Sequence, residues 1–528
     1  MAPPLSAGDT DAGLRPHDHY KIRLPKWRYS LRQKLLPLIR WETPYLAAIQ
    51  GSLRSDPLDT YFAITANLGT HTFFMIFLPI CFWFGYTEFG RGLVHVLASG
   101  VFFSGFMKDF FCLPRPLSPP LHRITMSGSA ALEYGFPSTH STNAVSVALY
   151  SLLVLRDNPS IPDNQRLIYI ILAALYATSI VFGRVYCGMH GFLDVVVGSI
   201  LGVILALAEW VYGPVTNQWV WYGTWVAPLT MTLAILLFVR IHPEPADPCP
   251  CFDDGVAFAG VVIGIEVGQW HYSKTSFGWN HPVPATVPYS YESVGLVTTF
   301  IRFAIGVVII FVWREVAKSV LLKYLPPLFR FIGRIGLVLP RRDFIDAREY
   351  KSVPSHLPDE TIPPIGQLPR MIRRGRSDSV GPQSAADAYE TLAFRERKRR
   401  ESLGQEGASP GSRSPVRSPL GQENGSNNNH HHQHQHHSFG GYLQQHQQQL
   451  KQEEKLREEE EEEKASNEAY EKQEREMLSQ IEKPRVRYDV EVVTKLLVYS
   501  GIAWWAVEGT PILFELVGLG AGQPGADK

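Results

Sequence analysis

The chain has 528 residues and carries 50 basic and 50 acidic side chains, so its zero net charge gives no reason to expect nucleic acid as a partner. Its five cysteines are too few and too scattered to predict a disulfide framework, and Cys249 and Cys251 lack partners at the spacing of a zinc site. The mean hydropathy of −0.06 averages very apolar segments with one very polar stretch.

The first 58 residues are polar and basic, and we expect no cleaved signal peptide among them. Residues 1–20 are predicted to be disordered. In residues 20–40 basic and apolar residues alternate, which is typical of a helix on an anionic membrane surface with Trp27 and Trp41 at headgroup level. An ordinary solvated helix packed on the domain fits the same pattern, so both interpretations stay open.

Apolar segments dominate the core that we assign to residues 59–340. Crossing a hydrocarbon layer of about 30 Å takes about 20 helical residues. The predicted crossings are residues 61–84, 93–111, 141–155, 167–182, 193–211, 226–241, 255–270 and 294–313. Residues 321–339 contain two prolines and two arginines, so an interfacial or kinked helix is as good an interpretation as a crossing.

A last membrane helix is predicted within residues 490–520, with residues 495–519 as its apolar part. The fold class is therefore all-α, a polytopic transmembrane helical bundle of about nine or ten membrane helices. Two of the predicted crossings contain Glu266 and Arg302. Because charges at membrane depth are costly and tend to pair, we expect a Glu266–Arg302 ion pair. A polar lining of a lipid cavity is the alternative.

Residues 345–485 have a different composition, with serine-proline pairs, a histidine-glutamine tract and six consecutive glutamates. Such a stretch cannot bury enough apolar surface to form a domain, and we predict a disordered low-complexity insert. Ser377 and Ser402 follow arginines and are candidate phosphorylation sites.

Three polar motifs stand where apolar segments end. Lys108 and Arg115 are seven residues apart in KDFFCLPRP, and residues 137–140 read PSTH. Residues 183–194 contain Arg184, His190 and Asp194 at the spacing R-x5-H-x3-D. Each motif taken singly has an ordinary explanation, such as a lysine that snorkels or a basic cap at a membrane interface.

The spacing of these residues suits phosphate chemistry. On a helix, His190 and Asp194 would share a face, where the carboxylate can accept the proton of one imidazole nitrogen and leave the other free. Ser138 is predicted to cap the third helix, whose N-terminus attracts an anion. Lys108 and Arg115 are expected to approach the same anion from a helix end and from the following turn.

Together the motifs resemble the type-2 phosphatidic acid phosphatase superfamily, whose pattern is K-x6-R-P, P-S-G-H and S-R-x5-H-x3-D. Thr139 stands in place of the middle glycine, and Gly183 in place of the serine before the arginine. The first departure, with RPLSPP at residues 115–120 and R-V-Y-x-G-M-H, is similar to the sphingosine-1-phosphate phosphatase branch. The resemblance covers roughly residues 60–210.

The resemblance implies a metal-independent phosphoric monoester hydrolase without cofactors. It implies that His190 is the nucleophile and forms a phosphohistidine, that Asp194 orients it, and that His140 protonates the leaving alkoxide. The implied phosphate-binding residues are Lys108, Arg115, Ser138, Thr139 and Arg184.

The implied partners are the bilayer and a phosphorylated sphingoid long-chain base, with no nucleic acid. A broader lipid phosphate or isoprenoid diphosphate phosphatase is the first alternative, and a non-catalytic headgroup-binding scaffold is the second. The resemblance also implies an endoplasmic reticulum membrane and a lumenal site. About eight basic residues between positions 21 and 54 instead favour a cytosolic N-terminus and, two crossings later, a cytosolic site.

Overall fold

The computed structural model describes residues 12–13, 17–66, 68, 71–118, 120–124, 133–336, 341–353 and 487–521. The predicted disorder of residues 1–20 and of the insert lies mostly outside these ranges. Residues 345–353 are described and belong with the core, because β1 (Phe344–Ile345) pairs in parallel with β2 (Arg487–Tyr488).

Helices make up about three quarters of the described residues. In order they are α1 (His17–Arg23), α2 (Lys26–Leu53), α3 (Asp56–Ala66), α4 (His71–Trp83), α5 (Thr87–Phe111), α6 (Thr139–Arg156), α7 (Asp163–Tyr186), α8 (Phe192–Tyr222), α9 (Val226–Ile241), α10 (Cys251–Tyr272), α11 (Tyr291–Arg334), α15 (Val490–Trp504), the π-helical η4 (Trp505–Gly509) and α16 (Thr510–Leu516). Five stretches are long and apolar enough to cross a membrane: α5, α7, α8, α11 and Val490–Leu516. The predicted all-α multi-pass bundle is confirmed. The predicted number of nine or ten membrane helices is not, because within the described residues five helices have the length and composition of a crossing.

Two predicted segments differ in detail. Residues 61–84 do not form one helix, since α3 ends at Ala66 and α4 begins at His71. Residues 321–339 form no separate crossing, because α11 continues through Pro326 and Pro327 to Arg334.

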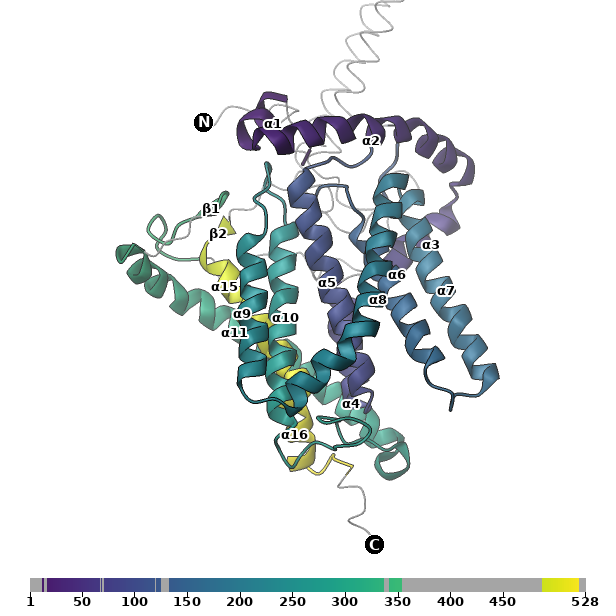
Figure 1. Ribbon diagram of the computed structural model, residues 1–528, viewed down its shortest axis with the longest axis vertical. Coiled ribbons are helices and arrows are strands. Elements are labelled where there is room, and N and C mark those ends of the chain that lie inside the picture. The colour runs from purple at the N-terminus through teal and green to yellow at the C-terminus, as the bar shows by residue number, and fades with distance from the viewer. Residues whose placement is uncertain are drawn as a thin grey trace, which may run out of the picture. The chain divides into compact units, whose positions relative to one another are not determined.

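The long helices stand side by side, while α1 and α2 lie across one end of the bundle (Figure 1). Helix α5 runs through the middle and contacts α6, α8 and α10. Because α2 contacts both α5 and α7, it covers the end at which these two helices finish. The basic N-terminal segment is thus packed on the bundle, and Trp27 and Trp41 remain 60% and 64% exposed on its outer side.

Helices α6 and α8 pack closely through glycines, as the small residues of the fifth predicted crossing indicated. A Cβ on Gly198 would lie 2.6 Å from the carbonyl oxygen of Ser138. A Cβ on Gly202 would lie 2.5 Å from that of Thr142. The two glycines therefore bring α8 against the start of α6, where the second motif lies.

The predicted Glu266–Arg302 ion pair is wrong. Glu266 accepts a hydrogen bond from Arg91 at 2.6 Å and lies 3.0 Å from a ring nitrogen of His95, both on α5. Arg302 donates to backbone carbonyls and lies over the ring of Phe514. Both buried side chains have polar partners, because an isolated charge is costly at this depth, but the sequence alone could not show which partners they take.

Candidate active site

The three motifs meet at the end of the bundle that α2 covers. Lys108 lies in the last turn of α5, and Arg184 lies in the last turn of α7. Ser138 is the N-cap of α6, and His190 comes just before α8. All four side chains are buried. The prediction that each motif sits at the end of an apolar segment is confirmed.

Lys108 and Arg115 converge on one carboxylate. The Nζ of Lys108 lies 3.0 Å from Oε2 of Glu133, and Nη2 of Arg115 lies 3.3 Å from the same oxygen. The Nε of Arg115 also donates to the backbone carbonyl of Glu133 at 3.2 Å. The two cations therefore share one anion-binding position, as their spacing predicted.

The imidazole of His190 is held between a carbonyl and a guanidinium. Its Nδ1 lies 2.9 Å from the carbonyl oxygen of Gly135, and its Nε2 lies 3.1 Å from Nη1 of Arg115. A carbonyl can only accept and a guanidinium can only donate, so Nδ1 carries the proton and Nε2 presents its lone pair. Burial, together with the neighbouring cations, holds the pKa of His190 well below its usual range. The ring is therefore neutral, and its unprotonated Nε2 accepts a hydrogen bond from Arg115.

Asp194 lies near Nδ1 of His190, as the spacing predicted, but the two residues do not share a helical face. His190 precedes α8, so the two residues are not on one helical face. Asp194 Oδ2 accepts the backbone N–H of Gly191 at 2.9 Å and lies 3.5 Å from Nδ1 of His190. Nδ1 of His190 is closer to the carbonyl oxygen of Gly135 than to Asp194, because the chain turns immediately before α8.

The turn between α7 and α8 fixes the backbone of His190. The N–H groups of Met189 and His190 donate to the carbonyl of Arg184, at 3.2 and 3.3 Å. Gly188 adopts a φ of +64°, and a Cβ there would lie 2.7 Å from the carbonyl oxygen of His122. Only glycine fits this turn without strain.

Arg184 is 6% exposed, and its Nε has no hydrogen-bond partner within the described part of the chain. A buried donor without a partner is costly unless a ligand supplies the acceptor. The charge of Arg184 also lowers the pKa of His190, so the two residues are close. The unpaired Nε and this proximity make Arg184 a candidate phosphate ligand.

The start of α6 has the geometry of an anion-binding helix end. Ser138 Oγ accepts hydrogen bonds from the backbone N–H and the hydroxyl of Ser141, so the predicted N-cap is confirmed. Thr139 Oγ1 accepts from Ser104 at 2.8 Å. His140 lies in the first turn, half-buried, and close enough to His190 to lower its proton affinity. The first-turn amides of a helix have no intrahelical acceptors and favour negative charge.

Helix α2 contributes contacts that sequence reasoning missed. Glu42 Oε1 accepts the N–H of Leu193 at the start of α8, and burial raises the pKa of Glu42. Gln50 donates to the carbonyls of His122 and Tyr186, at 2.7 and 2.9 Å. These residues lie far from the motifs in sequence, and nothing in their local pattern points to the site.

Glu133 was also missed, although the sequence does contain a signal. It is the only acidic residue between Arg115 and His140. A single carboxylate between two cationic motifs is a candidate partner for their positive charges.

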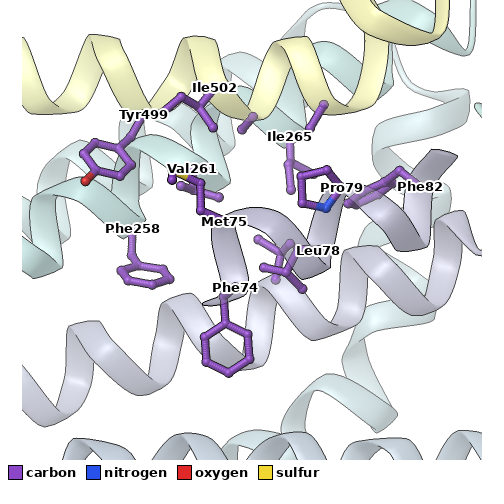
Figure 2. Close-up of a pocket in the computed structure, with 13 residues that line it drawn as sticks. Phe74, Met75, Leu78, Pro79, Phe82, Phe258, Val261, Ile265, Tyr499 and Ile502 are labelled. Carbon is purple, nitrogen blue, oxygen red and sulfur yellow. The ribbon is translucent and has the colours of Figure 1, made fainter. Parts of the chain in front are cut away.

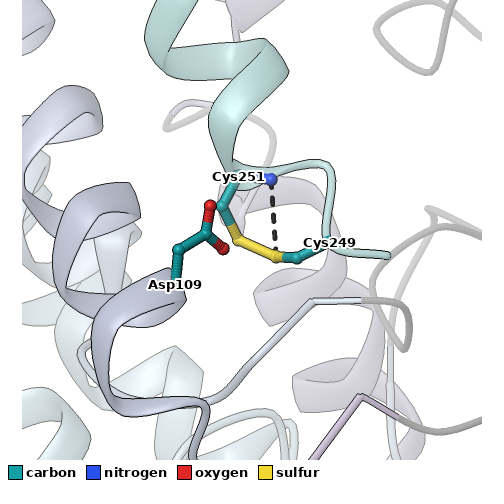
Figure 3. Close-up of side chains that lie close together, drawn as sticks. All are labelled: Asp109, Cys249 and Cys251. Carbon is teal, nitrogen blue, oxygen red and sulfur yellow. Dashed lines mark hydrogen bonds between the residues drawn. A yellow bond between two sulfur atoms is a disulfide. The ribbon is translucent and has the colours of Figure 1, made fainter. Parts of the chain in front are cut away.

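Asp109, Cys249 and Cys251 form a second cluster, next to the start of α10 (Figure 3). Cys249 and Cys251 are joined by a disulfide, which the count of cysteines did not predict. Disulfide sulfurs are not thiolates and do not bind zinc as thiolates do. In this oxidised form the cluster is a covalent link in the loop before α10.

An apolar pocket lies between α4, α5, α10 and α15 (Figure 2). Its lining includes Phe74, Leu78, Val94 and Phe258 and contains no charged side chain. Val94 and Lys108 are on the same helix, so the pocket is about 21 Å along α5 from the cations. It contains no group that could carry out phosphate chemistry.

The comparisons with known proteins agree with the site. The sequence profile of the PAP2 superfamily matches residues 89–218, which contain all three motifs. A dihydrosphingosine 1-phosphate phosphatase of Schizosaccharomyces pombe is 43% identical over 316 residues, which are 60% of this chain and 75% of that protein. One from Saccharomyces cerevisiae is 35% identical over 323 residues, 61% of this chain and 78% of that protein.

The human sphingosine-1-phosphate phosphatase 2 is 25% identical over 280 residues, 52% of this chain and 68% of that protein. No solved structure gives a significant match. The chain belongs to the PAP2 superfamily, and the family and the named relatives make it a phosphatase.

Proposed function

We propose that this protein hydrolyses sphingoid long-chain base 1-phosphates, as part of sphingolipid metabolism. The observation that carries the proposal is the position of Arg115, which contacts both the unprotonated Nε2 of His190 and the carboxylate of Glu133. A phosphate that replaced this carboxylate would lie beside the imidazole nitrogen. The names of the relatives support the choice of the lipid.

Substrate binding is assigned to the cations and to the start of α6. The phosphate would accept hydrogen bonds from Lys108, Arg115 and Arg184, with Ser138 shaping the helix end and the Thr139 amide donating. A phosphoryl group in transfer gathers charge on its equatorial oxygens. Preorganised donors in a site that excludes water stabilise that charge strongly.

The chemistry is assigned to two histidines. The Nε2 lone pair of His190 attacks phosphorus while the bond to the lipid oxygen breaks, and His140 gives its proton to that oxygen. A water molecule then attacks the phosphorus of the phosphohistidine, and His140 takes a proton from this water. The N–P bond breaks and inorganic phosphate is released. Asp194, 3.5 Å from Nδ1, would stabilise the positive charge on the ring of the intermediate.

No cofactor is assigned, because the three cations supply the charge stabilisation. We expect activity to survive EDTA after dialysis. Complete loss of turnover that magnesium restores would reject this mechanism.

We propose that the protein resides in the endoplasmic reticulum membrane with its site facing the lumen, as the resemblance implies. The N-terminal helices lie on the same side of the membrane as the site. The chain that leads into the insert is on this side too, because Arg342 donates a hydrogen bond to the carbonyl of Arg23 in α1. The positive-inside rule favours the opposite orientation. The sequon Asn424-Gly425-Ser426 in the insert provides a test. Glycan on Asn424 that is lost in Asn424→Gln supports a lumenal site, whereas protease cleavage of the insert in sealed microsomes contradicts it.

The deciding experiment is phosphate release by the purified protein. Dihydrosphingosine 1-phosphate is compared with phosphatidate and farnesyl diphosphate, and His190→Ala is the blank. We expect the sphingoid substrate to have the highest kcat/KM. Preference for either other substrate would favour the broader phosphatase, and binding without turnover would favour a scaffold.

A further inference from the structure

Glu133 lies on the open side of the cation pair. Its side chain is 24% exposed, whereas those of Lys108 and Arg115 are 4% and 5% exposed. The carboxylate is therefore the most accessible of the three charged groups. The mechanism above gives it no role.

A bound phosphate and the carboxylate of Glu133 compete for the same donors. Lys108 Nζ and Arg115 Nη2 both donate to Glu133 Oε2, and the mechanism assigns both groups to the phosphate. A dianionic phosphate displaces a single carboxylate from such a pair. The backbone of Glu133 is tied to Arg115 Nε at 3.2 Å, so the displaced side chain stays beside the phosphate.

A carboxylate beside a phosphate monoester repels it unless the ligand also brings a positive charge. A sphingoid base 1-phosphate does so, because it has an ammonium group on the carbon next to the one that bears the phosphate ester. Phosphatidate and simple alkyl phosphates have no such group. Asp254, in the first turn of α10, is near enough to interact electrostatically with Glu133 and Lys108.

We propose that the carboxylate of Glu133 moves from Lys108 and Arg115 to the substrate's ammonium group and so selects amino-bearing lipid phosphates. The inference rests on the proposed function and names the group by which that site recognises its substrate. Without substrate, the Glu133 carboxylate binds the two cations, and in the substrate complex it would bind the amine instead. The same residue then separates sphingoid base phosphates from glycerolipid phosphates.

The test compares two lipids of equal chain length, dihydrosphingosine 1-phosphate and octadecyl phosphate, of which the second lacks the amine and the neighbouring hydroxyl. Removing only the charge of Glu133 isolates the effect of the amine. The variant is Glu133→Gln, which keeps the shape and removes the charge. The matched control is Asp163→Asn, an exposed carboxylate at the other end of α7 from Arg184. We expect kcat/KM of Glu133→Gln to fall about 10- to 100-fold on the amino lipid, the effect of one charge-assisted hydrogen bond. On the alkyl phosphate it should stay the same or rise, because a competing anion has been removed.

The outcomes separate the inference from the proposed function. Equal losses on both lipids would make Glu133 a positioning residue for the cations and reject the subsite, as would an unchanged rate on the amino lipid. Wild-type enzyme that hydrolyses octadecyl phosphate but not the amino lipid would reject the proposed function and the subsite together. If Glu133→Gln does not fold, Glu133→Asp is measured instead, and the ratio of the two kcat/KM values should still shift toward the alkyl phosphate.

Discussion

Nη1 of Arg115 lies 3.1 Å from Nε2 of His190, and the same guanidinium group donates to the carbonyl of Met189 and to Glu133. One planar cation thus connects the imidazole nitrogen to the anion-binding position. It also fixes the tautomer, because a guanidinium has no lone pair to accept a proton from Nε2. Lysine could not replace Arg115, because an ammonium group does not offer several donors in one plane.

His190→Ala should abolish phosphatase activity without unfolding the protein. The ring makes two polar contacts inside the site, while its backbone is held by Arg184. We expect turnover of dihydrosphingosine 1-phosphate to fall by at least about 10⁴-fold, as for loss of other nucleophiles. The variant is assayed at matched expression with an unchanged gel-filtration profile. Substantial remaining turnover would show that His190 does not form the covalent intermediate.

His140→Ala should be impaired in a way that depends on the leaving group. A general acid contributes about 10²–10⁴-fold when it protonates a poor leaving group. We expect a loss in this range on a sphingoid base phosphate and a much smaller loss on an aryl phosphate, whose leaving oxygen needs no proton. The measurement is kcat/KM on both substrates, with His122→Ala as the control histidine. Equal losses on both would count against the acid role.

Lys108→Gln should move the acid limb of the pH profile to higher pH. Burial and the neighbouring cations lower the pKa of His190, so the enzyme keeps a neutral ring as pH falls below 6.5 and loses it only near the lowered pKa. Removing one positive neighbour raises this pKa toward its usual value, and activity is then lost at a higher pH. The readout is kcat/KM against pH for both enzymes on one substrate, whose own ionisation affects both alike. A limb that stays in place or moves to lower pH would contradict the prediction.

The sequence predicted the site's residues better than their contacts. Lys108, Ser138, Arg184 and His190 were placed at helix ends because the apolar segments and the motifs are both local patterns. The contact of His190 with Gly135 could not be predicted, since it depends on how the loop before α6 meets the turn before α8. Spacing alone suggested a helical pair with Asp194, and it is the start of α8 at Phe192 that rules this out.

Contacts between distant segments also could not be predicted from the sequence, because they depend on how the helices pack. Glu42 meets the start of α8 across about 150 residues, and its surroundings read simply as part of a basic helix. Glu266 had one obvious candidate partner within the predicted membrane segments, but Arg91 and His95 lie on the neighbouring helix and take both of its oxygens. Composition shows that a buried charge needs a partner, and only the packing of helices selects it.

Deleting residues 355–480 should leave catalysis largely intact. All three motifs precede residue 195, and the chain on either side of the deletion is already joined by the β1–β2 pair. Tyr350 supports this junction by donating to Asp489 at 2.6 Å and packing against Tyr488. The remaining residues therefore need only a short flexible connection for α15 to dock.

The comparison variant is a longer deletion of residues 342–488, which removes both strands and Tyr350. We expect this variant to lose stability, because the start of α15 loses its packing partners, while the shorter deletion keeps the wild-type kcat/KM within about twofold. Both are measured in detergent with a long-chain base phosphate at matched expression. A well-folded short deletion without activity would show that the insert takes part in the working site. Within the described residues, the side chains that contact Lys108, Arg115 and His190 include Glu133 and Asp194, and both precede the insert.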